Sequence, residues 1–503
     1  MKAKTLMVVG TSSSAGKSLL VTALCHSFAR RGIRVAPFKA QNMSNNAAVC
    51  PDGSEIGRAQ AVQAAAAGLE PAVDMNPVLI KPEADSYSQV VVMGKPWRSL
   101  SAREYYPKKD FLWKKVTASL DRLRADYDLV IIEGAGSAAE LNLRKGDIVN
   151  MAVALYAQSP VLLVGDIDRG GIFAQLLGTL WLLPPEERKL IKGLIVNKFR
   201  GDITLFEDGI DILEKRGDVP VLGVAPYMCD LQIPEEDAVA LEAPQPVKLT
   251  SNTDMDIVVV RLPRIANFDD FDPLMAEAGA RVRYLSSPQD LGNPQAIIIP
   301  GTKSTMNDLD WMRAQGWDEA IKWHASQGGA VIGICGGYQM LGLAIQDPKQ
   351  AESKRENAPG LGLLPIKTIF SDEKDTHQAR AIIKNGAGWM AALEGKSIAG
   401  YEIHMGRTVG ENPWLEITER SGESVTVLDG AISADGRIWG CYIHGLFDNA
   451  SLRRAWLTSL GWAGEKDSPV EKTDPFAASL TYLADTIESA LDMEKLEAII
   501  WDS

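Results

Sequence analysis

The sequence is poor in the residues that build disulfide frameworks and metal clusters. It contains five cysteines and five histidines among 503 residues, and no two cysteines form a C-x-x-C pair or another zinc-binding spacing. Such an odd and dispersed set of cysteines indicates a reducing compartment, so we expect a cytoplasmic protein. The spacing argues against a disulfide-stabilised fold and against a structural zinc site.

Basic tracts and long apolar runs are also missing. The net charge is −13, and no Lys/Arg-dense stretch stands out, which argues against nucleic acid as the main partner. A local basic pocket for a small anion remains compatible with this charge. The apolar run that follows Met1–Lys4 is too short for a signal peptide, and none approaches membrane-spanning length. We therefore expect no membrane partner, while the oligomeric state stays open.

A chain of this length exceeds one ordinary hydrophobic core, so two or three domains are expected. In residues 1–233, buried strands alternate with helical stretches, which predicts a doubly wound parallel α/β sheet. Proline and polar residues without periodicity in 234–255 indicate a linker. A second strand–helix series occupies 256–460, and the remainder, 461–503, carries no motif and is expected to be helical.

A phosphate loop follows the first predicted strand. The sequence Gly10-Thr11-Ser12-Ser13-Ser14-Ala15-Gly16-Lys17-Ser18 lies between an apolar run and a helical pattern, with five residues rather than four between its glycines. Backbone N–H groups would surround phosphates, Lys17 would reach the β and γ oxygens, and Ser18 would bind Mg²⁺. A Ser/Gly-rich turn is the alternative. The predicted ATP-binding residues of the loop are Gly10, Thr11, Ser14, Ala15, Gly16, Lys17 and Ser18.

Polar residues end several further strands, at the edge where open α/β sheets bind ligands. Glu133 ends one buried strand and is placed to bind Mg²⁺ directly or through water. Asn197 and Lys198 end another and suit recognition of a base. The segment Pro77–Ser88 is expected to be a substrate-facing loop. Each of these segments also has a plain structural interpretation.

The second series contains the pattern of a nucleophile elbow. Gly333-Ile334-Cys335-Gly336-Gly337 follows an apolar run and precedes a helical one, a small-x-Cys-x-Gly arrangement that exposes one side chain on a strained turn. The helix N-terminus favours a thiolate and a developing oxyanion. A buried structural cysteine is the alternative. Gly336 and a glycine turn at Gly301 are the expected oxyanion donors.

A histidine that follows a later apolar run completes the pattern. His444 comes directly after Cys441-Tyr442-Ile443 and is the natural base for the cysteine. His404 is the competing candidate.

The motifs resemble two known domain families. The loop at Gly10–Ser18, the strand end Glu133–Gly136 and the Asn197-Lys198 turn resemble the dethiobiotin synthetase-type ATPase domain, whose superfamily phosphorylates carboxylates. The cysteine elbow and the strand-borne histidine resemble a class I glutamine amidotransferase domain, which releases ammonia through a cysteinyl thioester. Many such domains carry Glu two residues after the histidine. Here that position is Leu446, so the third residue stays open, and Glu402 has no positional support.

The order of the domains and the sequence Tyr442–Phe447 resemble the cobyric and cobyrinic acid synthase family, and residues 41–46, 165–171 and 197–202 resemble its cobyric acid branch. The resemblance implies ATP and Mg²⁺ as cofactors, and L-glutamine and a corrinoid as substrates. It further implies amidation of the b, d, e and g carboxylates of adenosylcobyrinic acid a,c-diamide through acyl phosphates. The residues then expected at the substrate carboxylate or acyl phosphate are Lys39, Gln41, Asn42, Asp166 and Arg169.

Two other hypotheses compete with a ligase of the cobyric acid branch. A sister ligase would act on another corrinoid acid or on a cell-wall precursor. A nucleotide-dependent switch or partitioning ATPase would retain an inactive amidotransferase-like domain, and the Cys335/His444 pair argues against it.

Overall fold

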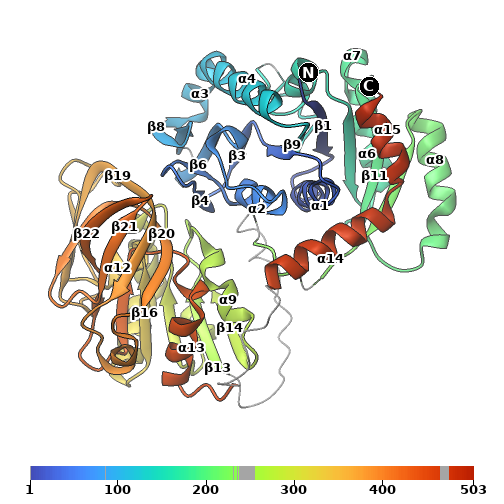
Figure 1. Cartoon of the computed structure of the whole chain (residues 1–503). Coiled ribbons are helices and arrows are strands. Elements are labelled where there is room, and N and C mark those ends of the chain that lie inside the picture. Colours follow the sequence, from blue (N-terminus) through green and yellow to red (C-terminus); the bar gives the residue numbers. More distant parts are fainter. Residues whose placement is uncertain are drawn as a thin grey trace.

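The computed structural model describes residues 2–84, 87–144, 146–229, 231–234, 236, 255–464 and 475–502. The described residues form two lobes, each built around its own parallel sheet (Figure 1). Most of the expected linker at 234–255 lies outside the described residues. Within the described part of the chain, no helix is both long and apolar enough to cross a membrane.

The first domain is organised around a sheet whose described strands are all parallel. The predicted doubly wound α/β architecture is thus confirmed. In spatial order the strands are β12 (Val221–Pro226), β11 (Ile191–Phe199), β10 (Val161–Asp166), β1 (Lys4–Gly10), β9 (Leu129–Ser137) and β2 (Val35–Phe38).

Successive residues of these strands enter two separate cores, one on each face of the sheet. Leu6 and Val8 pack on one face, and Met7 and Val9 pack on the other. This alternation explains why the strands are continuous apolar runs, since both faces are buried. The first face is covered by α1 (Lys17–Arg30), α14 (Pro475–Ala490) and α15 (Met493–Trp501). The second is covered by α4 (Lys109–Asp126), α5 (Met151–Ala157), α6 (Ile172–Leu182) and α8 (Glu207–Gly217).

A smaller sheet adjoins the edge near β2. Its strands are β3 (Gln41–Met43), β6 (Val78–Ala84), β7 (Tyr87–Val92) and β8 (Lys95–Ser101), beside the pair β4 (Ala47–Val49) and β5 (Glu55–Gly57). The short helices α2 (Arg58–Ala66), α3 (Ala102–Tyr105) and α7 (Pro185–Arg188) complete this domain. The expectation of a loop at Pro77–Ser88 was wrong. Most of that segment is strand β6, and Lys81 is buried against Glu55 at 2.6 Å.

The second domain repeats the parallel α/β plan. Its first sheet has the order β14 (Ala280–Leu285), β13 (Met255–Val260), β15 (Ala296–Ile299), β16 (Ala330–Ile334), β24 (Ile438–Cys441) and β23 (Ala431–Ile432). Only β23 pairs antiparallel among these described strands. The helices are α9 (Asp272–Met275), α10 (Thr305–Gln315), α11 (Trp317–Ser326), α12 (Gly336–Leu341) and α13 (Ala450–Ser459).

A second sheet of this domain lies against the first domain. It comprises β18 (Asn357–Pro359), β17 (Ala344–Gln346), β19 (Ile366–Ile383), β20 (Ser397–Gly410), β21 (Leu415–Arg420) and β22 (Glu423–Asp429). On β19, Gln378 donates to the Val49 carbonyl and Lys374 pairs with Glu55, both in the first domain. The sheet therefore supplies much of the contact between the domains.

The C-terminal helices return to the first domain, where they appear in red beside the blue and green elements of Figure 1. Ser27 on α1 donates to Glu488 on α14, and the Asp492 amide donates to the Leu222 carbonyl at 2.7 Å. Gly223 has no room for a side chain, because a Cβ there would lie 2.0 Å from the Ala490 carbonyl oxygen. Residues 475–502 of the tail expected at 461–503 are therefore part of the first domain's packing.

We expect Leu483→Ala to destabilise the first domain. Leu483 is fully buried in the core beneath α14, and such truncations cost about 2–5 kcal/mol. This corresponds to a fall of roughly 5–15 °C in the thermal midpoint of that domain. The matched control is Tyr482→Ala on the same helix, where the side chain is 57% exposed. Equal effects of the two substitutions, followed by calorimetry, would contradict the packing described.

Candidate functional site: a cysteine–histidine pair and a phosphate loop

Cys335 lies at the tip of a strained turn between β16 and α12. Its backbone has φ 52° and ψ −108°, a conformation that costs energy for a residue with a side chain. The turn is tightly enclosed, because a Cβ on Gly333 would lie 2.6 Å from the Tyr338 nitrogen. A Cβ on Gly337 would lie 1.9 Å from the Ile299 carbonyl oxygen. Glycine at both positions thus allows the strand, the turn and the helix to pack closely around the thiol.

His444 lies within hydrogen-bonding reach of this thiol. Burial alone would raise the pKa of Cys335, but the charge of His444 and hydrogen bonds from His444 and from the Gly336 amide lower it. Burial would lower the pKa of His444, yet Asp270 and Cys335 raise it to about 10. Each group thus stabilises the charged form of the other, and the thiolate–imidazolium pair that they favour is the reactive form of a cysteine nucleophile.

Asp270 is the third member of this group, and sequence reasoning missed it. Its Oδ2 accepts from His444 Nδ1 at 2.6 Å, and its Oδ1 accepts from the Gly445 amide at 2.8 Å. Both side chains are buried, so the carboxylate fixes the ring and stabilises its positive charge. The acidic pair at positions 269 and 270, shortly after strand β13, is the one local signal for it.

Glu402 serves the competing histidine instead. Glu402 Oε1 lies 3.2 Å from His404 Nε2, and Arg420 binds the same carboxylate. Burial would lower the pKa of His404, but Glu402 raises it. His404 packs flat on Tyr442, with ring centroids 3.8 Å apart.

The two expected oxyanion glycines have different surroundings. The Gly336 amide hydrogen-bonds the Cys335 sulfur, as a donor at the base of the elbow does. A Cβ on Gly301 would lie 2.8 Å from His444 Cε1, so this glycine borders the imidazole. The structure brings both to the cysteine–histidine pair.

The phosphate loop is compact around the ammonium of Lys17. Lys17 Nζ donates to the Ser12 carbonyl at 2.8 Å, to the Ser13 carbonyl at 3.2 Å and to the Gly136 carbonyl at 3.1 Å. Gly16 has φ 93°, which a side chain would strain. The loop thus directs the start of helix α1 and its N–H groups toward a common point.

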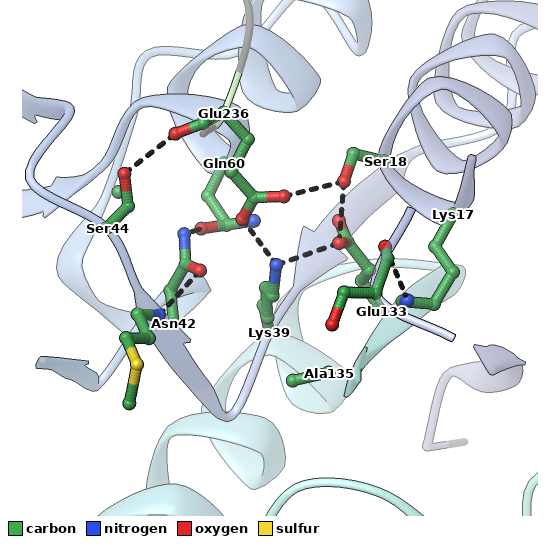
Figure 2. A network of polar contacts seen from close by, with 12 residues as sticks. Lys17, Ser18, Lys39, Asn42, Ser44, Gln60, Glu133, Ala135 and Glu236 are labelled. Carbon is green, nitrogen blue, oxygen red and sulfur yellow. Dashed lines mark hydrogen bonds and ion pairs between the residues drawn. The ribbon is translucent and has the colours of Figure 1, made fainter. Parts of the chain in front are cut away.

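Beside this loop, two carboxylates share a hydroxyl and an ammonium (Figure 2). The Ser18 hydroxyl lies 2.8 Å from Glu133 Oε1 and 2.8 Å from Glu236 Oε2. Lys39 Nζ binds the same two carboxylates, at 2.8 Å and 2.5 Å respectively. Burial would lower the pKa of Lys39, but Glu133 and Glu236 raise it, so the amine stays charged.

Glu236 is a second residue that sequence reasoning missed, because it falls in the segment expected to be a linker. Its carbonyl accepts from the Ser44 hydroxyl at 2.8 Å, which fixes this residue over the site. Burial would raise its pKa, but Lys39 and the hydrogen bonds from Ser18 and Asn42 lower it. The Glu236 carboxylate therefore contacts Ser18, which is expected to bind Mg²⁺, as well as Lys39 and Asn42, which are expected to bind the substrate.

The expected base-recognition pair contacts the back of the phosphate loop. Asn197 Nδ2 donates to the Ala15 carbonyl at 2.8 Å, and Lys198 Nζ donates to the Ser14 carbonyl at 2.7 Å. Lys198 also pairs with the buried carboxylate of Asp166 at 3.0 Å. These side chains hold the loop from the neighbouring strands.

Three other residues that were expected to bind nucleotide or substrate lie at the edge of the phosphate-loop site. Thr11 donates to Gln175 at 3.0 Å, beside the loop. Arg169 is largely exposed and lies 3.9 Å from Asp166. The Gln41 side chain accepts from the Tyr105 hydroxyl.

Asn42 lies deeper in the site. Its side chain is buried and donates to Gln60 Oε1 on α2 at 2.9 Å. Together with Lys39 it surrounds the carboxylate of Glu236 (Figure 2).

Comparison with known families agrees with this division into two sites. Residues 6–239 match the family described as the CobQ/CobB/MinD/ParA nucleotide binding domain. Residues 256–452 match the CobB/CobQ-like glutamine amidotransferase domain. The fold and the cysteine–histidine pair thus define a nucleotide-dependent glutamine amidotransferase with both domains on one chain.

Full-length relatives make the assignment narrower. The cobyric acid synthase of Chloroflexus aurantiacus is 55% identical over 503 residues, which cover 99% of this chain and 100% of the relative. That of Herpetosiphon aurantiacus is 54% identical over 502 residues, 99% of both chains. Among solved structures, PurLQS from Thermotoga maritima has a TM-score of 0.33 at 19% identity, covering 41% of this chain and 99% of that one. The chain belongs to the cobyric acid synthase family, whose members are glutamine-dependent amidating ligases.

We expect Asp270→Asn to reduce the thiolate character of Cys335. Loss of the carboxylate removes the largest influence that raises the pKa of His444. The imidazolium then deprotonates at lower pH and stabilises the thiolate less. Between about pH 6 and 8 the unmodified protein should react with iodoacetamide at Cys335 faster than the variant, whose rate should rise more steeply with pH and approach the behaviour of a free thiol. Identical pH profiles, measured by peptide mass spectrometry against free N-acetylcysteine, would exclude this role for Asp270.

Proposed function

We propose that this chain uses ATP and glutamine to amidate the b, d, e and g carboxylates of adenosylcobyrinic acid a,c-diamide, giving adenosylcobyric acid. The observation that carries the proposal is the pairing, on one chain, of a buried Cys335–His444–Asp270 group with a phosphate loop beside Lys39. One site releases nitrogen and the other activates a carboxylate. The family membership supports the corrinoid as the acceptor.

Glutamine hydrolysis takes place at the thiolate. Cys335 Sγ attacks the side-chain amide carbon of glutamine, and the Gly336 amide stabilises the oxyanion that forms. The C–N bond then breaks, and His444 gives its proton to the departing nitrogen, so that ammonia leaves. Asp270 holds the ring during this transfer. Water, deprotonated by His444, hydrolyses the thioester to glutamate, and the sulfur leaves as the thiolate beside the protonated imidazole.

Carboxylate activation takes place at the phosphate loop. A carboxylate oxygen of the corrinoid attacks the γ-phosphorus of ATP, ADP leaves, and an acyl phosphate forms. Ammonia then displaces phosphate to give the amide. Lys17 and the N–H groups at the start of α1 offset the negative charge on the transferred group, and Lys39 is placed to orient the carboxylate.

The residues at this site fit Mg²⁺. The Ser18 hydroxyl and the Glu133 carboxylate, 2.8 Å apart, are oxygen donors of the kind that Mg²⁺ prefers, and Glu236 adds another beside them. A bound Mg²⁺ would neutralise charge on the phosphates. No group of three or more His, Cys, Asp or Glu side chains arranged for a metal ion occurs among the described residues, so nucleotide phosphates would supply the remaining ligands.

The product assignment is tested by mass spectrometry. Incubation of the protein with adenosylcobyrinic acid a,c-diamide, Mg-ATP and glutamine should yield four successive acid-to-amide conversions. Conversion of a different carboxylic acid, with release of ADP and glutamate, would retain the mechanism and reject the substrate. Absence of ATP and glutamine turnover with every acid offered would reject the function.

We expect Cys335→Ala to separate the two chemistries. Without the thiolate, glutamine-driven amidation should fall by at least about a thousandfold, while synthesis from free ammonium salts should stay within about twofold of normal. Lys17→Ala is the matched comparison, because it should remove synthesis from either nitrogen source. Both activities are measured as amide formed per enzyme. Loss of ammonia-driven synthesis in Cys335→Ala would contradict the division of labour.

A further inference from the structure

Arg58 of the first domain contacts two residues of the second domain that pack against or adjoin the partners of His444. Arg58 is the first residue of α2, and its guanidinium is enclosed by the second domain. Its Nε is 2.9 Å from Asp269 Oδ2, and its Nη2 donates to the Tyr401 hydroxyl. The guanidinium also lies 5.1 Å from the centroid of the Tyr401 ring. Burial would lower the pKa of Arg58, but Asp269 raises it, so the charge is retained.

The two residues that Arg58 contacts both support His444. The Tyr401 ring stacks on the imidazole, with centroids 5.3 Å apart and an angle of 17° between the planes. The backbones of Tyr401 and His444 also exchange hydrogen bonds of 2.8 and 3.1 Å. Asp269 directly precedes Asp270, the acceptor for His444 Nδ1. Through Tyr401 the Arg58 guanidinium restrains the face of the imidazole, and through the Asp269–Asp270 segment it restrains the imidazole Nδ1.

The segment that leads to Asp270 also makes other hydrogen bonds to the first domain. Asn267 Nδ2 donates to the Ala47 carbonyl at 2.8 Å and to the Tyr401 hydroxyl at 2.7 Å. The Phe268 amide donates to Asn46 Oδ1 at 3.1 Å, while the Arg58 amide donates to the Asn46 carbonyl at 3.1 Å. Residues 46 and 47 thus hold both the start of α2 and the loop that carries Asp270.

Helix α2 also contacts the phosphate site. Gln60 Oε1 accepts from Asn42, and Gln63 Nε2 donates to Glu133 Oε2 at 2.5 Å. Arg58 stands on the same short helix, about half a turn from Gln60 and about one and a half turns from Gln63. Helix α2 therefore connects Glu133 and Asn42 of the phosphate site to the guanidinium of Arg58.

We propose that Arg58 is a positioning residue for glutamine hydrolysis, supplied by the first domain. It orients Tyr401 and the Asp269–Asp270 loop, and through them the His444 imidazole. This inference rests on the proposed function of the Cys335 site, and it adds that release of ammonia depends on the seating of α2 and so responds to ligands at the phosphate loop.

The test uses full-length Arg58→Ala and Arg58→Lys, with glutamate release from glutamine as the readout. We expect Arg58→Ala to lower kcat for glutamine hydrolysis about 10- to 100-fold, because misplacing a catalytic group by a fraction of an ångström has effects of this size. The KM for glutamine should stay within about twofold, and stimulation by Mg-ATP should disappear. Arg58→Lys should recover part of kcat, since it keeps a charge beside Asp269. Synthesis from ammonium salts should be retained.

Gln378→Ala is the control for general loosening of the interface. It removes a hydrogen bond to the Val49 carbonyl without touching α2, and it should leave glutamine hydrolysis unchanged. Equal losses in Gln378→Ala and Arg58→Ala would overturn the proposal, as would an unchanged kcat in Arg58→Ala or a change confined to KM. Should Arg58→Ala fail to fold, Tyr401→Phe removes only the hydroxyl that Arg58 and Asn267 bind, and a kcat equal to that of the unmodified protein would then reject the idea.

The two proposals fail in different ways. Glutamate release needs no corrinoid, so a wrong acceptor leaves this test intact. Absence of glutamine hydrolysis in the unmodified protein rejects the function of the Cys335 site itself.

Discussion

Parallel strand pairing is the constraint on which both sites depend. In a parallel sheet all strands end at the same edge, so short loops from distant parts of the sequence meet there. In the first domain β1, β2, β9 and β10 bring the phosphate loop, Lys39, Glu133 and Asp166 to one edge. In the second domain β16 and β24 bring Cys335 and His444 to one edge, since the two strands are direct neighbours. Both chemistries are thus consequences of strand order rather than of any single motif.

The parts of the structure predicted from the sequence are those encoded by neighbouring residues. Apolar runs such as Leu6–Val9 predict buried strands, because a strand covered on both faces must be apolar throughout. The phosphate loop and the cysteine elbow are local turns with fixed glycine positions. In contrast, β19 is rich in charged residues and was not predicted, because its pairing with β20 and its packing are settled by tertiary contacts.

The missed site residues have the same explanation. Asp270 precedes His444 by 174 positions, and no periodicity links two residues so far apart. The contact between Arg58 and Tyr401 spans 343 positions and crosses between domains. Glu236 stands in a polar stretch whose composition is typical of a linker, and only its contacts with Ser18 and Lys39 set it apart.

Buried charge also specifies how the two domains meet. Glu55 of the first domain lies between Lys81 of its own domain and Lys374 of the second. Burial would raise the pKa of Glu55, but the two lysines lower it to about 2, while burial lowers the pKa of Lys374 to about 8. A buried charge such as that of Glu55 is costly when its partner is removed. A shift of one domain against the other therefore costs more free energy here than it would at an apolar interface. Specificity of docking is the natural role of such a group, because buried ion pairs add little net stability.

The return of α14 and α15 to the first domain has a consequence for how the protein folds while it is being translated. The sheet of that domain is made early, yet α14 and α15, which help to cover one of its faces, leave the ribosome only after the whole second domain. At roughly 5–20 residues per second, the intervening domain takes on the order of ten seconds or more to synthesise. During that interval the face beneath the C-terminal helices is uncovered, and the cysteine-bearing domain can fold first. A chain that stops before these helices therefore leaves part of a buried apolar face of the nucleotide domain exposed.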